Sequence, residues 1–457
     1  MTELVHDLPE GMIEWVAEVG QGEVTHIHRH VARREAWVVD VTRPDGTVVE
    51  GFLRLQRGMG HDKDVDPRRL ERETRIIQAL APTGVPVPEV YGWNPELRAT
   101  LFERDPGRAD IDKLQDPVRQ RAIMEDFIRV VAILHGLDLE ALGLDDIMPY
   151  KPTNASECAL NELDFVLAQW RQFLDDYSDP LISYGVNWLR RFVPESVARV
   201  SLVQGDTGPV NFMFQGNKVS SVIDWELGHY GDPMEDLGNI SVREMWNPCG
   251  GLDGLFELYQ KESGIPYTRF GAQYYRVQQN VRGMVPIHAV CADAHPRESV
   301  AWYLCYRYLA DRATCEALAD AMGVEVDTPE MPESMGEADV VAEAAIYAQE
   351  HDVASKLTDP FAVSRANDVK TLIQCMDRKR RYGDAIESAE LDDLVEIVGR
   401  RPASLSDGFR AFDEVIKTGR FDDEVVIRYL LRRAYREEWL YLPAVNLYPE
   451  RRWADLD

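Results

Sequence analysis

The 457-residue sequence contains no long hydrophobic run, because no stretch of about 18 apolar residues occurs in it. We therefore expect no membrane-spanning helix. The N-terminal segment, Met1 to Pro9, is polar and acidic, so we expect no signal peptide. Cysteine is also scarce: the six residues are scattered and form no Cys-x-x-Cys pair, which argues against a disulfide framework or a zinc site. Reduced thiols and a cytoplasmic location are the expectation.

Positively charged residues are also scarce relative to negatively charged ones. The chain has 50 Lys and Arg against 79 Asp and Glu, and the net charge is −29. Such a balance disfavours nucleic acid and anionic membranes as partners, since both are bound by basic surfaces. It could steer a cationic substrate, although a generally acidic proteome explains the same charge. With 45% hydrophobic residues the chain can bury ordinary cores, and its length predicts two or three domains.

The most informative stretch is residues 201–238, which holds two carboxylates and an amide in a fixed order. Asn211 follows Asp206 by five residues, and Asp224 comes thirteen residues later. Mg²⁺ prefers oxygen ligands, usually one or two carboxylates with phosphate oxygens and water, so Asn211 and Asp224 are the predicted metal ligands. Asp206 is the predicted base, which takes the proton of an acceptor hydroxyl. Either aspartate alone would more often be a turn or cap residue, whereas the ordered set favours phosphoryl transfer.

The local pattern predicts a hairpin that carries the two metal ligands. Residues 212–214 and 219–223 are expected to be strands, joined by a turn at 215–218. A hairpin returns its two ends to the same place. Asn211 and Asp224, which flank it, are therefore expected to face one ion.

The same stretch resembles the catalytic core of the aminoglycoside phosphotransferase family, the kinase-like enzymes that include choline kinases and antibiotic kinases. Gln204 stands where that family usually has a histidine that braces the loop, and a glutamine can also donate and accept hydrogen bonds. The resemblance implies an α+β, protein-kinase-like fold of two lobes, with ATP and Mg²⁺ as cofactors. The matching motifs are Gly205-Asp206, Asn211, Ile223-Asp224-Trp225-Glu226, Gly231-Asp232-Pro233 and Asp236-Leu237.

Residues 10–104 are expected to form a small, mostly β, nucleotide-binding lobe. Strands are predicted at 36–41 and 48–55, and the turn at Gly20 and Gly22 is expected to join two strands and to approach phosphates closely. A plain hairpin turn explains these glycines equally well.

The resemblance assigns further nucleotide contacts in this lobe. It implies a phosphate-binding cation on the third strand, which would be Arg54, and a glutamate that pairs with it. Glu73, within a helix predicted at 66–80, is the candidate, and Glu71 competes with it. The hinge backbone at residues 102–105, with Phe102, Glu103 and Asp105, would contact adenine.

Residues 105–325 are expected to form a larger, helical catalytic and substrate lobe. Glu226 would lie beside the metal, and Asp236 would brace the catalytic loop. Trp246, Tyr274 and Tyr275 are candidate walls of the acceptor pocket, although aromatic residues at helical spacing more often belong to a core. The sequence around Leu134-His135 resembles the branch of the family that is associated with acyl-CoA dehydrogenases.

His26, His28 and His30 alternate, so a strand would place them on one face. A metal site and a solvated strand face are both open interpretations, and the spacing along a strand is awkward for tetrahedral ligation.

Residues 337–457 follow a linker at about 326–336 and are expected to form an all-α extension. Three roles are left open for this extension: it could form a homodimer, cover the substrate as a lid, or dock a partner.

The combined prediction is transfer of the ATP γ-phosphate to a hydroxyl group of a small molecule. A hydroxyacyl or other catabolic substrate is favoured by the resemblance outside the motif. An aminoglycoside kinase, a nucleotide-binding pseudokinase or scaffold, and a metal-dependent phosphohydrolase are the alternatives.

Overall fold

The computed structural model describes residues 8–30, 36–56, 66–295, 298–326, 328–333 and 336–456. Parts of the polar segment from Met1 to Pro9 and of the predicted linker at 326–336 lie outside these residues. The chain divides into two compact units. Unit 1 contains residues 1–161, 195–272 and 454–457, and unit 2 contains residues 162–194 and 273–453.

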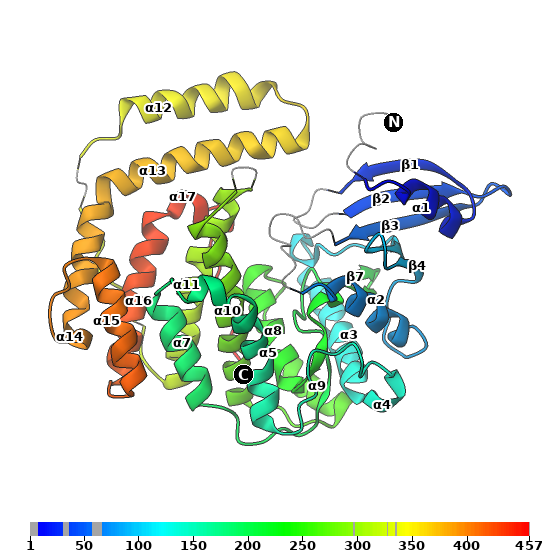
Figure 1. Cartoon of the computed structure of the whole chain (residues 1–457), viewed down its shortest axis with the longest axis horizontal. Helices are drawn as coiled ribbons and strands as arrows, with labels where there is room; N and C mark the ends of the chain where they lie inside the picture. Colours follow the sequence, from blue (N-terminus) through cyan, green and yellow to red (C-terminus); the bar gives the residue numbers. More distant parts are fainter. Residues whose placement is uncertain are drawn as a thin grey trace. The chain divides into compact units, whose positions relative to one another are not determined.

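Unit 1 contains a five-stranded antiparallel sheet (Figure 1). Its strands are β1 (Glu23–Arg29), β2 (Ala36–Thr42), β3 (Val48–Leu55), β4 (Val90–Asn94) and β5 (Ala99–Glu103), in the order β1-β2-β3-β5-β4. Alternate residues of β2 and β3 are buried, including Trp37, Val39 and Leu53. This alternation is expected for strands that pack one face on a core.

The first element of the described residues is a helix and not a strand, which corrects the prediction for Gly20 and Gly22. Helix α1 (Met12–Gly20) buries Met12 and Val16, four residues apart, in the core beneath the sheet. The glycine turn therefore joins a helix to β1. A Cβ atom on Gly22 would lie 2.2 Å from the carbonyl oxygen of Thr42, so this glycine is needed for close packing against the end of β2. The loop between β1 and β2, at residues 31–35, lies outside the described residues.

Helix α2 (Arg69–Leu80) packs on the sheet, and its hydroxyl of Thr74 hydrogen-bonds that of Thr100 on β5 at 2.7 Å. The rest of unit 1 combines helices with two small antiparallel strand pairs. Its remaining elements are α3 (Pro117–Gly136), α4 (Leu139–Leu142), the first part of α5 (Ala155–Gln169), β6 (Ser201–Val203), β7 (Phe212–Gln215), β8 (Lys218–Val222), β9 (His229–Gly231), α8 (Pro233–Trp246), α9 (Leu255–Ser263) and the short 3₁₀ helices η3 (Ile111–Lys113) and η4 (Trp225–Leu227).

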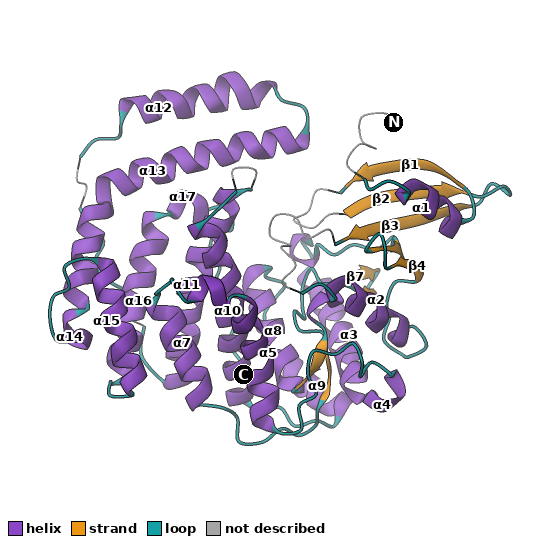
Figure 2. Cartoon of the chain, viewed as in Figure 1, coloured by secondary structure: helices purple, strands orange, loops and turns teal. Residues whose placement is uncertain are grey.

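The described residues of unit 2 form helices and no strands (Figure 2). Helices α12 and α13 run side by side. The elements are α6 (Arg171–Leu174), α7 (Pro180–Arg191), α10 (Arg269–Ala292, from residue 273), α11 (Val300–Met322), α12 (Val340–Tyr347), η5 (Ala348–Val353), η6 (Ala354–Lys356), α13 (Pro360–Asp393), α14 (Val395–Val398), α15 (Leu405–Thr418), α16 (Asp423–Leu440) and α17 (Leu442–Val445).

The two units differ from the predicted limits at 104, 325 and 337. Helices at 180–191 and 273–322 were expected in the catalytic lobe, but they cluster with the C-terminal helices. The reason is visible in α11, whose buried residues face several directions and contact α13, α16 and α17. A helix that is buried on most of its circumference needs partners on several sides. The extension is therefore the larger part of an all-α unit.

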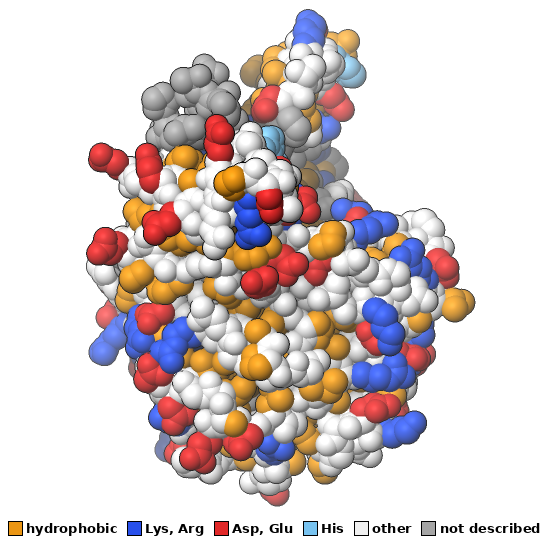
Figure 3. Space-filling model, turned by 90° about the vertical axis from the view of Figure 1, so that its right-hand side faces the viewer, with side chains coloured by type: hydrophobic (Ala, Val, Ile, Leu, Met, Phe, Trp, Pro, Cys, Tyr) orange, Lys and Arg blue, Asp and Glu red, His pale blue; other side chains and the backbone are white. Residues whose placement is uncertain are grey.

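No helix in the described part of the chain is both long and apolar enough to cross a bilayer. On the face shown in Figure 3, acidic and basic side chains are interspersed. The excess of acidic residues is thus not gathered into one patch on that face.

Candidate active site

The guanidinium of Arg54 is the centre of a cluster of carboxylates in unit 1. Its Nη1 lies 2.7 Å from Oε1 of Glu73 on α2 and 3.3 Å from Oδ1 of Asp224. Its Nη2 lies 3.2 Å from Oε2 of Glu226. The third strand, the helix that follows it and the loop after β8 therefore meet at this one side chain.

The electrostatics of the cluster keep Arg54 charged. Burial disfavours a charged guanidinium, but the attraction of Glu73, Asp224 and Glu226 outweighs it and raises the pKa of Arg54 above its ordinary value. Glu71, the competing candidate, lies elsewhere: it is paired with Arg68 on the helix surface at 3.0 Å. The structure thus places Glu73, and not Glu71, beside Arg54.

Gln204 ties the predicted base to the predicted metal ligand. Its Nε2 donates to the carbonyl oxygens of Ile223 at 3.0 Å and Asp224 at 2.8 Å. Its Oε1 accepts from the backbone N–H of Asp206 at 2.8 Å and from the hydroxyl of Thr207 at 3.1 Å. The fully buried side chain of Gln204, with its four hydrogen bonds, therefore fixes the loop of Asp206 to the loop of Asp224. The residue that departs from the family pattern therefore has a defined structural task.

A second brace comes from α8. Asp236 is fully buried and accepts hydrogen bonds from the backbone N–H groups of Gln204 at 3.0 Å and Gly205 at 3.1 Å. His135 Nε2 lies 3.0 Å from the same carboxylate, and its Nδ1 lies 2.7 Å from the hydroxyl of Tyr259. Burial alone would raise the pKa of Asp236, but these hydrogen bonds, first that of His135, lower it below its usual range. His135 is a buried structural residue at the end of α3.

Asn211 and Asp224 fit a magnesium ion bound together with phosphate. The Nδ2 of Asn211 donates to the carbonyl oxygen of Asp206 at 2.7 Å, which leaves its amide oxygen for a ligand. Within the described ranges, no group of three or more His, Cys, Asp and Glu side chains is placed to hold a metal alone. Mg²⁺ characteristically takes one or two protein carboxylates or amides and completes its shell with phosphate oxygens and water. These two residues meet that requirement only with a nucleotide present.

The backbone around these ligands is unusual. Val210, directly before Asn211, has φ +77°, and Asp224 has φ +61°. A positive φ is costly for a β-branched residue, and such conformations are kept where the surroundings impose them, often at functional sites. The unusual backbone thus includes one predicted metal ligand, Asp224, and the residue directly before the other, Asn211.

One residue of the site was missed by the sequence interpretation. Arg243 on α8 donates from Nε to Oδ1 of Asp206 at 2.8 Å, and its Nη2 donates to Oδ2. The predicted base is thus held by a guanidinium. A signal did exist, because Arg243 follows Asp236 by seven residues and so lies on the same helix face.

The predicted adenine segment lies at the end of β5, and part of its hydrogen-bonding capacity is already used. The N–H groups of Glu103 and Arg104 donate to the carbonyl oxygens of Glu89 and Glu50, at 2.8 and 3.0 Å. An adenine contact here would need other backbone groups of residues 102–105. The side chain of Phe102 is buried, and the carboxylate of Asp105 accepts from the Ser220 and Ser221 hydroxyls, which ties the segment to β8.

The three aromatic candidates for the acceptor pocket belong to different units. Trp246 is the last residue of α8 and is half-buried in unit 1. Tyr274 and Tyr275 are fully buried in unit 2, where the Tyr274 hydroxyl donates to the carbonyl oxygen of Leu189 at 2.9 Å. Both rings belong to the buried core of unit 2, and a contact of these tyrosines with the acceptor stays a prediction.

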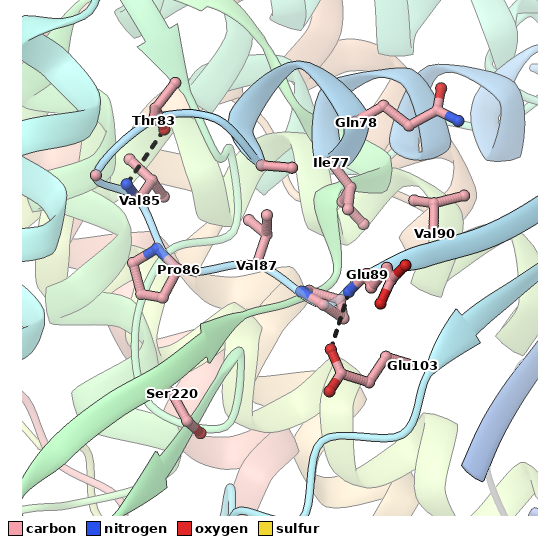
Figure 4. Close-up of a pocket in the computed structure, with 13 residues that line it drawn as sticks. Ile77, Gln78, Thr83, Val85, Pro86, Val87, Glu89, Val90, Glu103 and Ser220 are labelled. Carbon is pink, nitrogen blue, oxygen red and sulfur yellow. Dashed lines mark hydrogen bonds between the residues drawn. The ribbon is translucent and has the colours of Figure 1, made fainter. Parts of the chain in front are cut away.

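A cavity of about 560 Å³ lies beside the last turn of α2 and the connector at residues 83–90 (Figure 4). Glu103 lines it and accepts a hydrogen bond from the N–H of Glu89 at 3.1 Å. Arg54, Asp206 and Asp224 do not line this cavity. It is therefore separate from the carboxylate cluster.

The histidines of β1 form no metal site with other residues of the described chain. His26 and His28 are exposed, and their ring nitrogens lie 2.8 Å apart. Partial burial and the nearby imidazoles of His26 and His30 lower the pKa of His28. Of the two interpretations, the exposed strand face describes what is present.

Comparison with known proteins gives relatives for unit 1. Residues 33–274 match the model of the phosphotransferase enzyme family. The chain is 29% identical over 208 residues to acyl-CoA dehydrogenase family member 11 of Rattus norvegicus, covering 43% of this chain and 26% of that protein. It is 31% identical over 246 residues to the probable acyl-CoA dehydrogenase IBR3 of Arabidopsis thaliana, covering 45% of this chain and 29% of that protein. The chain thus spans only about a quarter of the length of these relatives.

Among solved structures, a protein of Ralstonia eutropha assigned as an aminoglycoside phosphotransferase has a TM-score of 0.54 and 22% identity, and the match covers 69% of this chain and 98% of that one. This likeness confirms the predicted α+β, kinase-like fold. The family match covers more than half of the chain and contains every residue of the carboxylate cluster. The chain belongs to the phosphotransferase enzyme family.

Proposed function

We propose that the chain transfers the γ-phosphate of ATP to a hydroxyl group of a small molecule. The supporting observation is the cluster in which Arg54 is held by Glu73, Asp224 and Glu226 next to the loop that carries Asp206. Catalysis of phosphoryl transfer consists mainly of positioning and charge neutralisation, and this cluster offers both.

The proposed role of each residue follows from the chemistry of its side chain. Arg54, oriented by Glu73, would bind phosphate oxygens, and Asn211 with Asp224 would hold the Mg²⁺ that neutralises their charge when it is bound. Asp206 would accept the proton of the acceptor hydroxyl. The hydroxyl oxygen then bonds to the γ-phosphorus as the bond from that phosphorus to the bridging oxygen breaks, and ADP leaves with the electron pair.

The acceptor belongs to the proposal as well. Relatives named acyl-CoA dehydrogenase family members support a hydroxyacyl or other catabolic substrate over an aminoglycoside. A cytoplasmic location goes with it, because all six cysteines are free thiols. A homodimer formed through the C-terminal helices stays a prediction, which the molecular mass in solution would test.

The experiment is a screen of hydroxyl compounds with Mg·ATP, in which phosphorylated products are detected by mass. We expect one class of compound to gain a phosphate group with wild type, and a loss of at least about 100-fold in kcat with Asp206→Asn or Asp224→Asn. Asp110→Asn is the matched control, since this exposed carboxylate pairs with Arg108 outside the cluster.

Each alternative gives a different result. Phosphate release without any phosphorylated product would indicate a phosphohydrolase. Nucleotide binding without turnover, unaffected by either cluster substitution, would indicate a scaffold and contradict the proposal.

A further inference from the structure

Helix α8 places the cationic side chain of Arg243 at the site, and the proposed mechanism assigns no role to it. The guanidinium of Arg243 contacts both oxygens of the proposed base, with Nε 2.8 Å from Oδ1 and Nη2 on Oδ2. The two side chains remain 23% and 20% exposed. The base is therefore covered by a cation, yet both groups stay within reach of a small molecule.

The backbone is arranged to keep Arg243 in this place. Gly208, in the loop after Asp206, has φ +140°, and a Cβ atom there would lie 2.6 Å from Cβ of Arg243 and 3.2 Å from Cα of Ile240. The stem of Arg243 thus lies directly on the loop. Asp236, two turns earlier on α8, holds the other end of the same loop through the N–H groups of residues 204 and 205. The position of Arg243 follows from this double attachment.

The contact has a consequence for the proposed reaction. Asp206 must offer an oxygen to the acceptor hydroxyl, while a guanidinium binds carboxylate and phosphate groups through the same paired N–H donors. An anion on the acceptor would therefore compete with Asp206 for Arg243. We propose that Arg243 determines acceptor specificity by binding an anionic oxygen group, a carboxylate or a phosphate, that the acceptor carries close to its hydroxyl. Exchange of this partner frees Asp206 to receive the hydroxyl proton.

This inference rests on the proposed function and narrows its substrate class. An anion that takes the place of Asp206 on Arg243 lies about 3 Å from the guanidinium, and the hydroxyl lies about 3 Å from the displaced carboxylate, so the anion and the hydroxyl of the acceptor are only a few ångströms apart. An acceptor with ammonium groups at that distance would be repelled by Arg243. The arrangement therefore favours hydroxy acids or their phosphate counterparts over aminoglycosides.

The first test needs no knowledge of the acceptor, because water can replace it in slow ATP hydrolysis. Sodium acetate and sodium methyl phosphate, compared with sodium chloride at equal ionic strength, serve as probes for the two anion classes. We expect at least one of them to raise hydrolysis by wild type severalfold and with saturation. Arg243→Gln should hydrolyse ATP faster than wild type without any anion and should not respond to the probes.

The second test uses the acceptor found in the screen and its uncharged ester. Arg243→Gln should raise KM for the anionic acceptor by about 10- to 100-fold, as expected for losing hydrogen bonds between charged groups. It should leave KM for the ester unchanged. Arg243→Lys should restore part of the binding, since it keeps the charge but not the paired donors. Arg121→Gln, an exposed arginine of α3 that pairs with Glu125, is the control.

Two results would overturn the inference. One is wild-type hydrolysis that is insensitive to both anions. The other is a fall in kcat with Arg243→Gln that is equal for charged and uncharged acceptors, as a purely structural brace would give. Failure of the proposed function looks different: ATP turnover would then be the same in wild type and Asp206→Asn, which would remove the basis for both.

Discussion

Replacing Gln204 by leucine would show whether one amide side chain joins the two halves of the site. The leucine side chain has a similar volume but no hydrogen-bonding groups, so all four side-chain hydrogen bonds of Gln204 would be lost. A neutral hydrogen bond contributes about 0.5–1.5 kcal/mol, and a buried donor left unpaired, such as the N–H of Asp206, costs about 1–3 kcal/mol. We expect the free energy of unfolding to fall by about 2–4 kcal/mol.

The catalytic effect should be larger than the stability effect. Without the brace, the predicted base and the predicted metal ligand are no longer fixed relative to each other, and a displacement of about 1 Å can reduce the rate by about 100-fold. Urea unfolding followed by tryptophan fluorescence and steady-state kinetics would measure the two effects. Gln204→His, which keeps one donor and one acceptor, should lie between wild type and leucine.

The matched control is Gln120→Leu. The side chain of this buried glutamine of α3 donates one hydrogen bond within the described residues, to the carbonyl oxygen of Ile111 at 3.0 Å. We expect a loss of about 1 kcal/mol and an unchanged kcat. If the two leucine variants have equal kcat and equal stability, the reasoning about Gln204 is refuted.

Three further predictions concern the supports of the site. Glu73→Gln should raise KM for ATP by about 10-fold because Arg54 loses the nearest of its three charged partners, whereas Glu71→Gln should change KM by less than about twofold; nucleotide titration compares the two variants. Gly22→Ala should lower the free energy of unfolding by more than about 2 kcal/mol through its clash, while Gly136→Ala, with open space around it, should not. A Gly22 variant with full stability but poor ATP binding would contradict the packing role. Asp236→Asn should cost about 3 kcal/mol at neutral pH. Because the folded pKa of Asp236 is lowered, the ionised carboxylate stabilises the fold above about pH 4, and the gap to wild type should shrink as pH falls further. If the stability difference between wild type and Asp236→Asn, measured by urea unfolding, stays constant down to pH 3, this prediction is wrong.

The parts of the fold that the sequence predicted are those with a strong local pattern. Apolar runs on either side of a turn predicted β2 and β3, and the ordered set of Asp206, Asn211 and Asp224 predicted the site. Helix α1 was missed although Met12 and Val16 stand at helical spacing, because a glycine turn suggested strands on both sides. Short amphipathic segments of this kind are ambiguous in sequence.

The contacts that the sequence could not give depend on tertiary placement. Arg243 is 37 residues from Asp206 along the chain, and only the packing of α8 on the loop brings them together. The tyrosines at 274 and 275 illustrate the opposite case, since a core and a pocket wall produce the same aromatic spacing. The unit boundaries also depend on which helices share a core, which no local pattern records.

The exposure of helix α12 affects how readily this helix unfolds locally. None of its side chains is buried, and Val340, Val341 and Tyr347 are 74%, 72% and 62% exposed. Most of the stability of a protein helix comes from packing its apolar face, and an isolated helix of this length is marginal in water. Its amide hydrogens should therefore exchange with solvent through a local opening of small free energy, long before those of the buried helix α3. Substitutions along α12 should accordingly be tolerated even where they replace valine.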